Sequence, residues 1–312
     1  PLAVTALIVP ALVLAGHGAM QYLPAENMPE TASEYARMVE SELGVVPTVD
    51  CGVGVRVPIH VDGVEVFEDQ ERFACDNPDF RGSCYVGSRV NRLEGRDRAG
   101  EPLPDVVWVY FCRSAGVELY ERGILSVQMI GHNTRTGATA FFEAPDADPD
   151  RPNPQPELLE FDEQGILMGK LPGPDDPAGF DAAFMPPPIQ CTRCHQADPF
   201  IHDPWIDSAR WPEDPSQPVI PELGGATAPY WIIGGPEWDR RTVHIEGNRC
   251  TTCHRAPDPR RFLDAGEYHV NDFMPPHAPG SMADDYAAIE ACYDAGPEAT
   301  PGCEWVEPPA SP

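Results

Sequence analysis

The sequence predicts a mainly β, sandwich-like N-terminal domain followed by an irregular, proline-rich C-terminal region of loops and short helices. Short β-branched runs, separated by Gly, Pro, Asp and Asn, occupy residues 45–144, and such runs are typical of strands in an all-β domain. The chain of 312 residues contains 38 prolines, which disfavour long helices. Ten cysteines are present, and disulfides between some of them would staple such a domain.

Residues 1–29 form an apolar N-terminal segment. Leu2 to Gly16 is almost wholly apolar and resembles the hydrophobic region of a signal peptide without its basic start. This stretch is shorter than the roughly 20 residues of a membrane-spanning helix, and Pro10 interrupts it. Two interpretations stay open: a signal remnant, or an extended strand donated to a neighbouring subunit.

A short helix opens the β domain, which is expected over residues 30–150. Thr31 can cap the helix, Glu34 can complete a capping box, and Gly44 ends the helical pattern. Strands are expected after it. The four clearest runs are Val53–Val57, Val64–Val66, Val106–Tyr110 and Ile124–Val127.

An acidic, proline-rich linker is expected over residues 151–179. EF-hand spacing is absent from it, so a solvated connector is favoured over a calcium site. Residues 180–312 then form the irregular C-terminal region. Four of the six tryptophans lie between positions 195 and 250 of this region, namely Trp205, Trp211, Trp231 and Trp238.

The most informative motif of the C-terminal region is a pentapeptide that occurs twice, at Cys191–His195 and Cys250–His254. Cys-x-x-Cys-His is the attachment signature of c-type haem. Its two cysteines form thioethers to one porphyrin, and its histidine becomes the proximal iron ligand. A zinc site made of both cysteine pairs is the main rival, but 55 residues separate the pairs, against roughly 15–20 in a compact zinc ribbon. The thioether cysteines would be Cys191, Cys194, Cys250 and Cys253.

Six cysteines remain outside these motifs, and an even remainder suggests three disulfides and an oxidising, periplasmic or extracellular compartment. Their order along the chain favours two local pairs and one long-range pair among 15 possible connectivities. These pairs are Cys75–Cys84, Cys292–Cys303 and Cys51–Cys112.

Over about the last 130 residues the chain resembles multihaem c-type cytochromes, with the two pentapeptides as the specific features. The resemblance implies two covalently bound haem c groups, proximal ligation by His195 and His254, and electron transfer as the role. One departure is that a Met-Pro-Pro element precedes the first motif at Met185 but follows the second at Met274. The pair of motifs is therefore interpreted as one asymmetric dihaem module.

The distal iron ligands have four candidates. His202 follows the first motif, and His244 precedes the second. His269 and Met274 both follow the second motif. The sequence favours His202 for one haem, with His244 and Met274 competing for the other; methionine would raise the reduction potential and histidine would lower it. His60 and His132 are expected to be structural.

The composition limits the partners. The formal charge of −29 disfavours nucleic acids and anionic membranes and suits basic redox proteins. No transmembrane span is expected, and a homo-oligomer or polymer could form through the N-terminal segment. The predicted function is electron transfer by an exported dihaem cytochrome, as a single carrier or as a subunit of a larger redox assembly. The alternatives are a dihaem peroxidase with one open iron and a structural assembly protein with zinc at the cysteine pairs.

Overall fold

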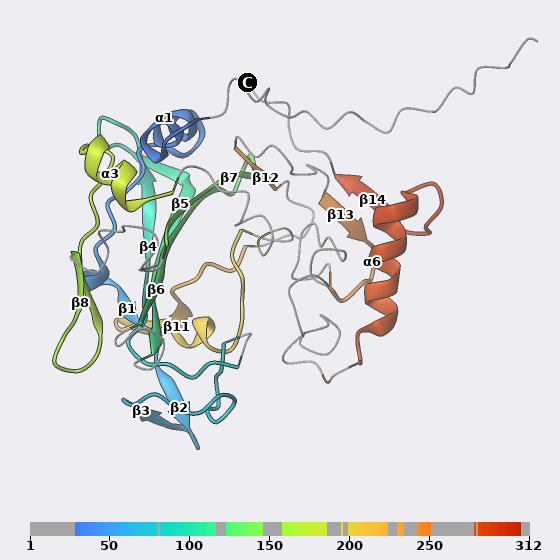
Figure 1. Cartoon of the computed structure of the whole chain (residues 1–312). Helices are drawn as coiled ribbons and strands as arrows, with labels where there is room; N and C mark the ends of the chain where they lie inside the picture. The colour runs from blue at the N-terminus through green and yellow to red at the C-terminus, as the bar shows by residue number, and fades with distance from the viewer. Residues whose placement is uncertain are drawn as a thin grey trace, which may run out of the picture.

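The computed structural model (Figure 1) describes the greater part of the chain. The described residues are 29–79, 82–116, 123–145, 158–185, 195, 199–223, 230–233, 242–250, 278 and 280–306. Of the apolar N-terminal segment, residues 1–28 lie outside these ranges. Both interpretations of that segment therefore stay predictions.

A six-stranded sheet with the strand order β1-β4-β5-β6-β7-β12 is the centre of the fold (Figure 1). Neighbouring strands are antiparallel, except that β12 pairs parallel with β7. The mainly β prediction is confirmed. The strands are β1 (Val55–Arg56), β4 (Arg89–Arg96), β5 (Pro102–Gly116), β6 (Gly123–Asn133), β7 (Ala138–Pro145) and β12 (Trp231–Ile232).

Three of the four expected strand runs coincide with strands, because Val64–Val66 is β3 and the other two lie inside β5 and β6. The run Val53–Val57 is shorter than expected, since only β1 (Val55–Arg56) is extended. Its first residue belongs to the 3-10 turn η2 (Cys51–Val53), which Asp50 caps by accepting a hydrogen bond from the Gly52 N–H.

One face of the sheet, called here the helix face, carries Trp108, Tyr110, Met129 and Phe142 and packs on two helices. These helices are α1 (Ala32–Leu43) and α3 (Pro177–Ala183), which lie together on one side of the sheet in Figure 1. The α1 helix is bounded as predicted. Thr31 accepts the Glu34 N–H at 3.2 Å, and Gly44 ends the helix at φ 67°.

The opposite face, called here the motif face, carries Val109, Phe111, Ile130 and Phe141, because successive strand residues point to opposite sides. It packs on irregular chain rather than on a second large sheet. The covering residues include Phe200, Trp205, Ile206, Val219 and Ile220. The sandwich-like expectation is therefore corrected for the described residues: one sheet has helices on one side and the segment 199–220 on the other.

Four two-stranded pairs surround the main sheet. The β2–β3 hairpin turns at Asp62 and Gly63, both with positive φ. The other three pairs are also short and follow β7 in sequence. The strands are β2 (Ile59–Val61), β3 (Val64–Val66), β8 (Leu159–Phe161), β9 (Leu167–Gly169), β10 (Arg210–Trp211), β11 (Asp214–Pro218), β13 (Thr242–Ile245) and β14 (Cys303–Val306).

The expected linker is, in its described part, packed chain. Leu159, Leu167 and Leu171 are at most 3 % exposed and belong to the core under the helix face. The same core also contains Phe184 and the residues 230–233 from beyond position 180. Apolar side chains at these positions bury more surface against the sheet than a solvated connector would, which explains the difference.

A separate small cluster forms near the C-terminus. Helix α6 (Ala283–Ala295) packs on the β13–β14 pair through Val243, Ile289 and Tyr293, and Figure 1 shows this unit beside the main sheet. A disulfide between Cys292 and Cys303 joins its helix to β14.

All three predicted disulfides are present. Cys51–Cys112 ties the η2 turn to β5, and Cys75–Cys84 closes a loop after β3. Three disulfides indicate an oxidising compartment, in agreement with the expected location outside the reducing cytosol. Within the described ranges, no helix combines the length and the apolar character that crossing a bilayer requires.

Candidate functional site

His195, the histidine of the first motif, lies against the motif face of the sheet. Its ring is 4.9 Å from the ring of Phe141, centroid to centroid, at a tilt of 45°. Phe141 belongs to β7 and stands opposite Ile130 of β6. The register of these two long strands therefore places an aromatic surface behind the motif histidine.

Two hydrogen bonds fix the orientation of His195. Its Nδ1 lies 3.0 Å from the carbonyl oxygen of Pro199, and the Tyr230 hydroxyl donates to the His195 carbonyl. A carbonyl oxygen can only accept, so Nδ1 carries the proton and the lone pair of the neutral ring is on Nε2. Histidines that bind metals in proteins are usually held in this way, with one nitrogen donating to a carbonyl and the other facing the metal.

Behind this loop lies His132, which is only 2 % exposed. Its Nδ1 is 2.9 Å from the Thr139 hydroxyl, which itself donates to the Gly137 carbonyl. The hydroxyl must therefore accept from His132, so Nδ1 of this ring is also protonated. The rings of Phe200 and Tyr230 meet His132 edge-on at 6.1 and 6.5 Å, and together they form the buried wall beneath His195. His60, in contrast, lies at the partly exposed hairpin strand β2.

His202, the first distal candidate, is paired with a carboxylate. Its Nδ1 lies 2.8 Å from Oδ1 of Asp207, and the two side chains are 35 % and 34 % exposed. Asp207 is the middle residue of the 3-10 turn η3 (Ile206–Ser208). His195 and His202 thus share one short segment that packs on the motif face.

His244, the second distal candidate, lies on β13 opposite Glu304 of β14. Its Nδ1 is buried and has no hydrogen-bond partner among the described residues. Leaving a buried polar nitrogen unpaired costs roughly 1–3 kcal/mol, and buried polar groups are otherwise almost always satisfied. His244 therefore differs from His195, whose Nδ1 donates to a carbonyl oxygen, and its role as a distal ligand stays a prediction.

The chain entering the second motif is anchored to α6. The Asp285 carboxylate accepts the Arg249 backbone N–H at 2.9 Å and its Nε at 2.7 Å. Asn248 donates from its side chain to the Asp285 carbonyl and accepts the Cys250 N–H. Burial by itself raises the pKa of Asp285, but the hydrogen bonds and charge of Arg249 outweigh it and lower this pKa. The first cysteine of the motif, Cys250, is thereby held beside the small apolar cluster of α6 and the β13–β14 pair, on which it packs.

The remaining site residues of the sequence analysis lie outside the described residues, namely Cys191, Cys194, Cys253, His254, His269 and Met274. Across the part of the chain that the structure describes, no group of three or more His, Cys, Asp or Glu is gathered as a metal site. The described part of the site thus consists of single histidines, each with its own surroundings.

Three kinds of residue around these histidines were not assigned from the sequence. They are the carbonyl of Pro199, the aromatic residues Phe141 and Tyr230, and the carboxylate of Asp207. Pro199 and Asp207 lie within five residues of a candidate histidine in the sequence, which is a usable signal. Phe141 carries no such signal, because only the strand register brings it to His195.

Comparison of the chain with protein-family models, with curated proteins and with solved structures finds no match.

Proposed function

We propose that the chain is an exported dihaem c-type cytochrome that transfers electrons between protein partners. The observation that carries the proposal is the geometry of His195. This histidine ends a Cys-x-x-Cys-His motif, and its Nδ1 donates to the Pro199 carbonyl at 3.0 Å. A proximal haem ligand needs this tautomer, with the Nε2 lone pair directed to the iron.

The use of cysteines supports the same function. The three disulfides consume the six cysteines that lie outside the motifs. The four motif cysteines are therefore left by simple counting, and four is the number that two haem groups require for their thioethers. Formation of disulfides also agrees with the oxidising compartments in which such proteins reside.

Each described residue then has a role at the first haem. His195 would supply Nε2 as the proximal ligand, while Pro199 and Tyr230 hold its ring and its backbone in place. Phe141 and the buried wall around His132 keep water from one side of the site. Each bound iron would accept and release one electron, cycling between its ferric and ferrous states. The covalent attachment suits a region in which the described residues form only short helices and short strands to enclose a cofactor.

The distal ligands follow the same reasoning. His202 and His244 are the described candidates, and His269 and Met274 compete with them for the second haem. His244 is a candidate because it lies six residues before Cys250 in the sequence. Because six-coordinate irons leave no place for peroxide, electron transfer is favoured over the peroxidase alternative.

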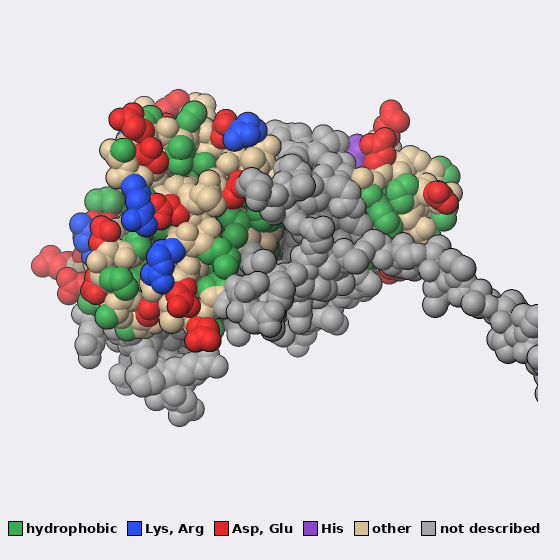
Figure 2. All heavy atoms as spheres, turned by 90° about the horizontal axis from the view of Figure 1, so that it is seen from above, with side chains coloured by type: hydrophobic (Ala, Val, Ile, Leu, Met, Phe, Trp, Pro, Cys, Tyr) green, Lys and Arg blue, Asp and Glu red, His purple; other side chains and the backbone are tan. Residues whose placement is uncertain are grey.

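The surface suits a basic redox partner. The chain carries 50 acidic and 21 basic residues. On the described surface in Figure 2, Lys and Arg side chains occur singly among Asp and Glu rather than as one patch. A surface with this balance attracts positively charged proteins over distances of about one Debye length, roughly 8–10 Å at physiological salt.

The test is to produce the chain in a host that matures c-type cytochromes and to count its haems. A pyridine haemochrome spectrum should give two c-type haems per chain. Replacing Cys191 and Cys194 by Ala should remove one haem, and replacing Cys250 and Cys253 should remove the other. A colourless protein that binds zinc would refute the proposal.

A second measurement separates the carrier from the peroxidase. The reduced wild-type protein should not bind carbon monoxide rapidly, because both irons have two protein ligands. His195→Ala should open one iron to carbon monoxide, whereas the matched control His60→Ala should leave both spectra unchanged. Rapid binding of carbon monoxide to the wild type would instead support the peroxidase.

A further inference from the structure

Asp207 accepts a hydrogen bond from His202 that the ligand role alone does not require. Its Oδ1 lies 2.8 Å from His202 Nδ1. An ionised carboxylate can only accept, so Nδ1 carries the proton and Nε2 is the nitrogen that can bind a metal. Charge-assisted hydrogen bonds of this kind are about twice as strong as those to a neutral acceptor.

The backbone that carries Asp207 is held firmly. Asp203 accepts the Ile206 N–H with Oδ1 at 2.8 Å, and its carbonyl accepts the Asp207 N–H at 3.1 Å. Trp205 and Ile206 are buried in the core under the motif face, at 5 % and 7 % exposure. The carboxylate of Asp207 thus projects from a fixed turn.

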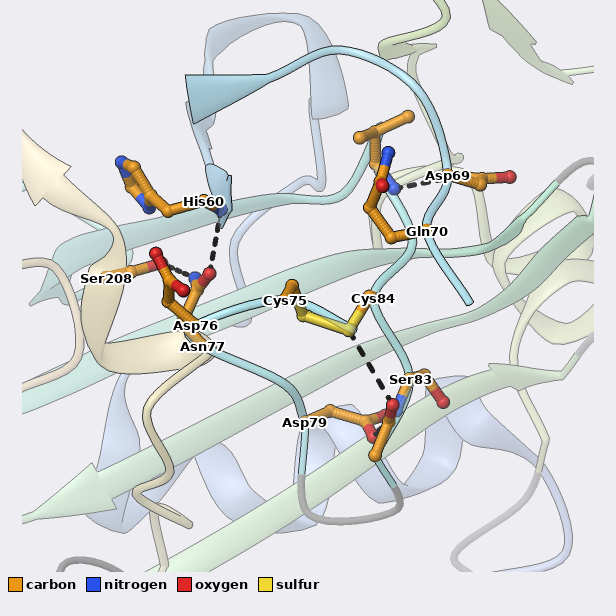
Figure 3. The surroundings of a disulfide bond; sticks show 12 residues. His60, Asp69, Gln70, Cys75, Asp76, Asn77, Asp79, Ser83, Cys84 and Ser208 are labelled. Atoms are coloured by element: carbon orange, nitrogen blue, oxygen red, sulfur yellow. Dashed lines mark hydrogen bonds between the residues drawn. A yellow bond between two sulfur atoms is a disulfide. The ribbon is translucent and has the colours of Figure 1, made fainter. Parts of the chain in front are cut away.

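The turn is also joined to the disulfide loop. The Ser208 hydroxyl donates to a carbonyl and accepts from the side-chain amide of Asn77 at 3.1 Å. Figure 3 shows Ser208 and Asn77 side by side near the Cys75–Cys84 disulfide. Asn77 is itself held by the His60 N–H and the Pro58 carbonyl. A covalently closed loop therefore supports the residue that orients His202.

We infer that Asp207 is a positioning residue for an iron ligand: it orients the ring of His202 and increases electron donation from Nε2 to the haem iron. This inference rests on the proposed function. The carboxylate gives the ring partial imidazolate character, which stabilises ferric over ferrous iron and lowers the reduction potential.

The two histidines of this segment then differ in a defined way. His195 donates to a neutral carbonyl, whereas His202 donates to an anion. The hydrogen bond to the carboxylate therefore lowers the potential of whichever iron His202 binds.

The experiment compares two variants of the haem-loaded full chain. Asp207→Asn removes the charge but keeps the side-chain size. Asp203→Asn removes one charge from the same turn, and its remaining amide oxygen can still accept the Ile206 N–H. Because both variants change the net charge equally, general electrostatic effects on the haems are matched.

Redox titration followed by optical spectroscopy is the main readout. Asp207→Asn should shift the equilibrium between ferric and ferrous iron about tenfold toward ferrous at one haem. This shift corresponds to a midpoint potential about 59 mV higher for a one-electron couple. Asp203→Asn should change it by much less. Electron paramagnetic resonance of the oxidised Asp207→Asn protein should show altered g-values for one low-spin haem.

Equal shifts in the two variants would overturn the inference, since the contact would then be an ordinary surface ion pair. His202→Ala gives an independent check, because it should leave one iron without its distal ligand and convert it to high spin. A haem that stays low-spin in His202→Ala refutes the inference whatever Asp207→Asn does. If the wild type carries no haem, the proposed function fails as well; if it carries two, only the positioning role is at stake.

Discussion

The buried ion pair between Asp79 and Arg113 gives the sharpest stability prediction. Asp79 Oδ2 lies 2.5 Å from the Arg113 guanidinium, and the two side chains are 2 % and 13 % exposed. Asp79 also accepts the Ser83 N–H, and the Arg113 guanidinium lies 5.3 Å from the ring centre of Trp205. The pair therefore joins the disulfide loop to β5, and the cation–π contact adds Trp205 from the segment that follows the first motif.

Asp79→Ala should lower the free energy of unfolding by about 3 kcal/mol. Removing one partner of a buried pair typically costs about 3–5 kcal/mol, because it leaves a charge buried without compensation. Arg113 retains some contact with solvent, so the lower end of this range applies. The matched control is Asp105→Ala, whose pair with Arg135 is 49 % and 69 % exposed and should be worth at most about 1 kcal/mol.

Urea unfolding followed by circular dichroism measures both variants. Asp79→Ala should shift the midpoint with little change in slope, since the surface exposed on unfolding is the same. The double variant Asp79→Ala/Arg113→Leu should recover part of the loss, because no uncompensated charge remains. Equal costs for Asp79→Ala and Asp105→Ala would refute the argument that burial makes the first pair different.

Three further predictions concern separate parts of the fold. Gly44→Ala should destabilise the protein more than Gly100→Ala in urea unfolding. Both glycines have positive φ, but a Cβ at Gly44 would lie 2.3 Å from the Arg96 carbonyl oxygen, whereas a Cβ at Gly100 would meet open space. The backbone strain of such a position alone costs about 1–3 kcal/mol. Replacing both cysteines of Cys51–Cys112 by Ser should lower the free energy of unfolding by about 4 kcal/mol, and the same change at Cys292–Cys303 should lower it by about 3 kcal/mol. The difference follows from the chain separations of 61 and 11 residues, because the longer loop restricts the unfolded chain more. Equal shifts of the melting temperature in the two variants would contradict this order. Asp285→Asn should be less stable than the wild type at neutral pH, and the difference should disappear on acidification. The pKa of Asp285 is lowered in the folded protein. The stabilisation by its carboxylate is therefore complete above about pH 4 and is lost as the pH falls through the lowered pKa. A difference that persists at about pH 2 would contradict the last prediction.

Local signals predicted the local structure well. Thr31 and Gly44 bound α1 as expected, since capping depends on residues only a few positions apart. The one departure is that Glu34 accepts the Glu30 N–H instead of the N–H of Thr31. The disulfides were also predictable, because two pairs are close in the sequence and the third follows by elimination.

Long-range packing was not predictable in the same way. Leu159, Leu167 and Leu171 lie in a stretch whose prolines and acidic residues indicated a solvated linker, yet all three are buried. Their burial depends on a surface supplied by distant residues of β5, β6 and β7. The same holds for Phe141 at the candidate site, because only the pairing of β6 with β7 decides which side of the sheet its ring occupies.

The parallel pairing of β12 with β7 has a consequence for the chain between the two strands. The chain passes from β7 through the first motif and returns at Tyr230–Ile233, which hydrogen-bonds to β7 and fills the same core. If haem is attached at Cys191 and Cys194, it is attached to a stretch of chain whose two flanking strands, β7 and β12, pair at one edge of the sheet. Formation of this pair would therefore fix both ends of the haem-bearing stretch at the same edge.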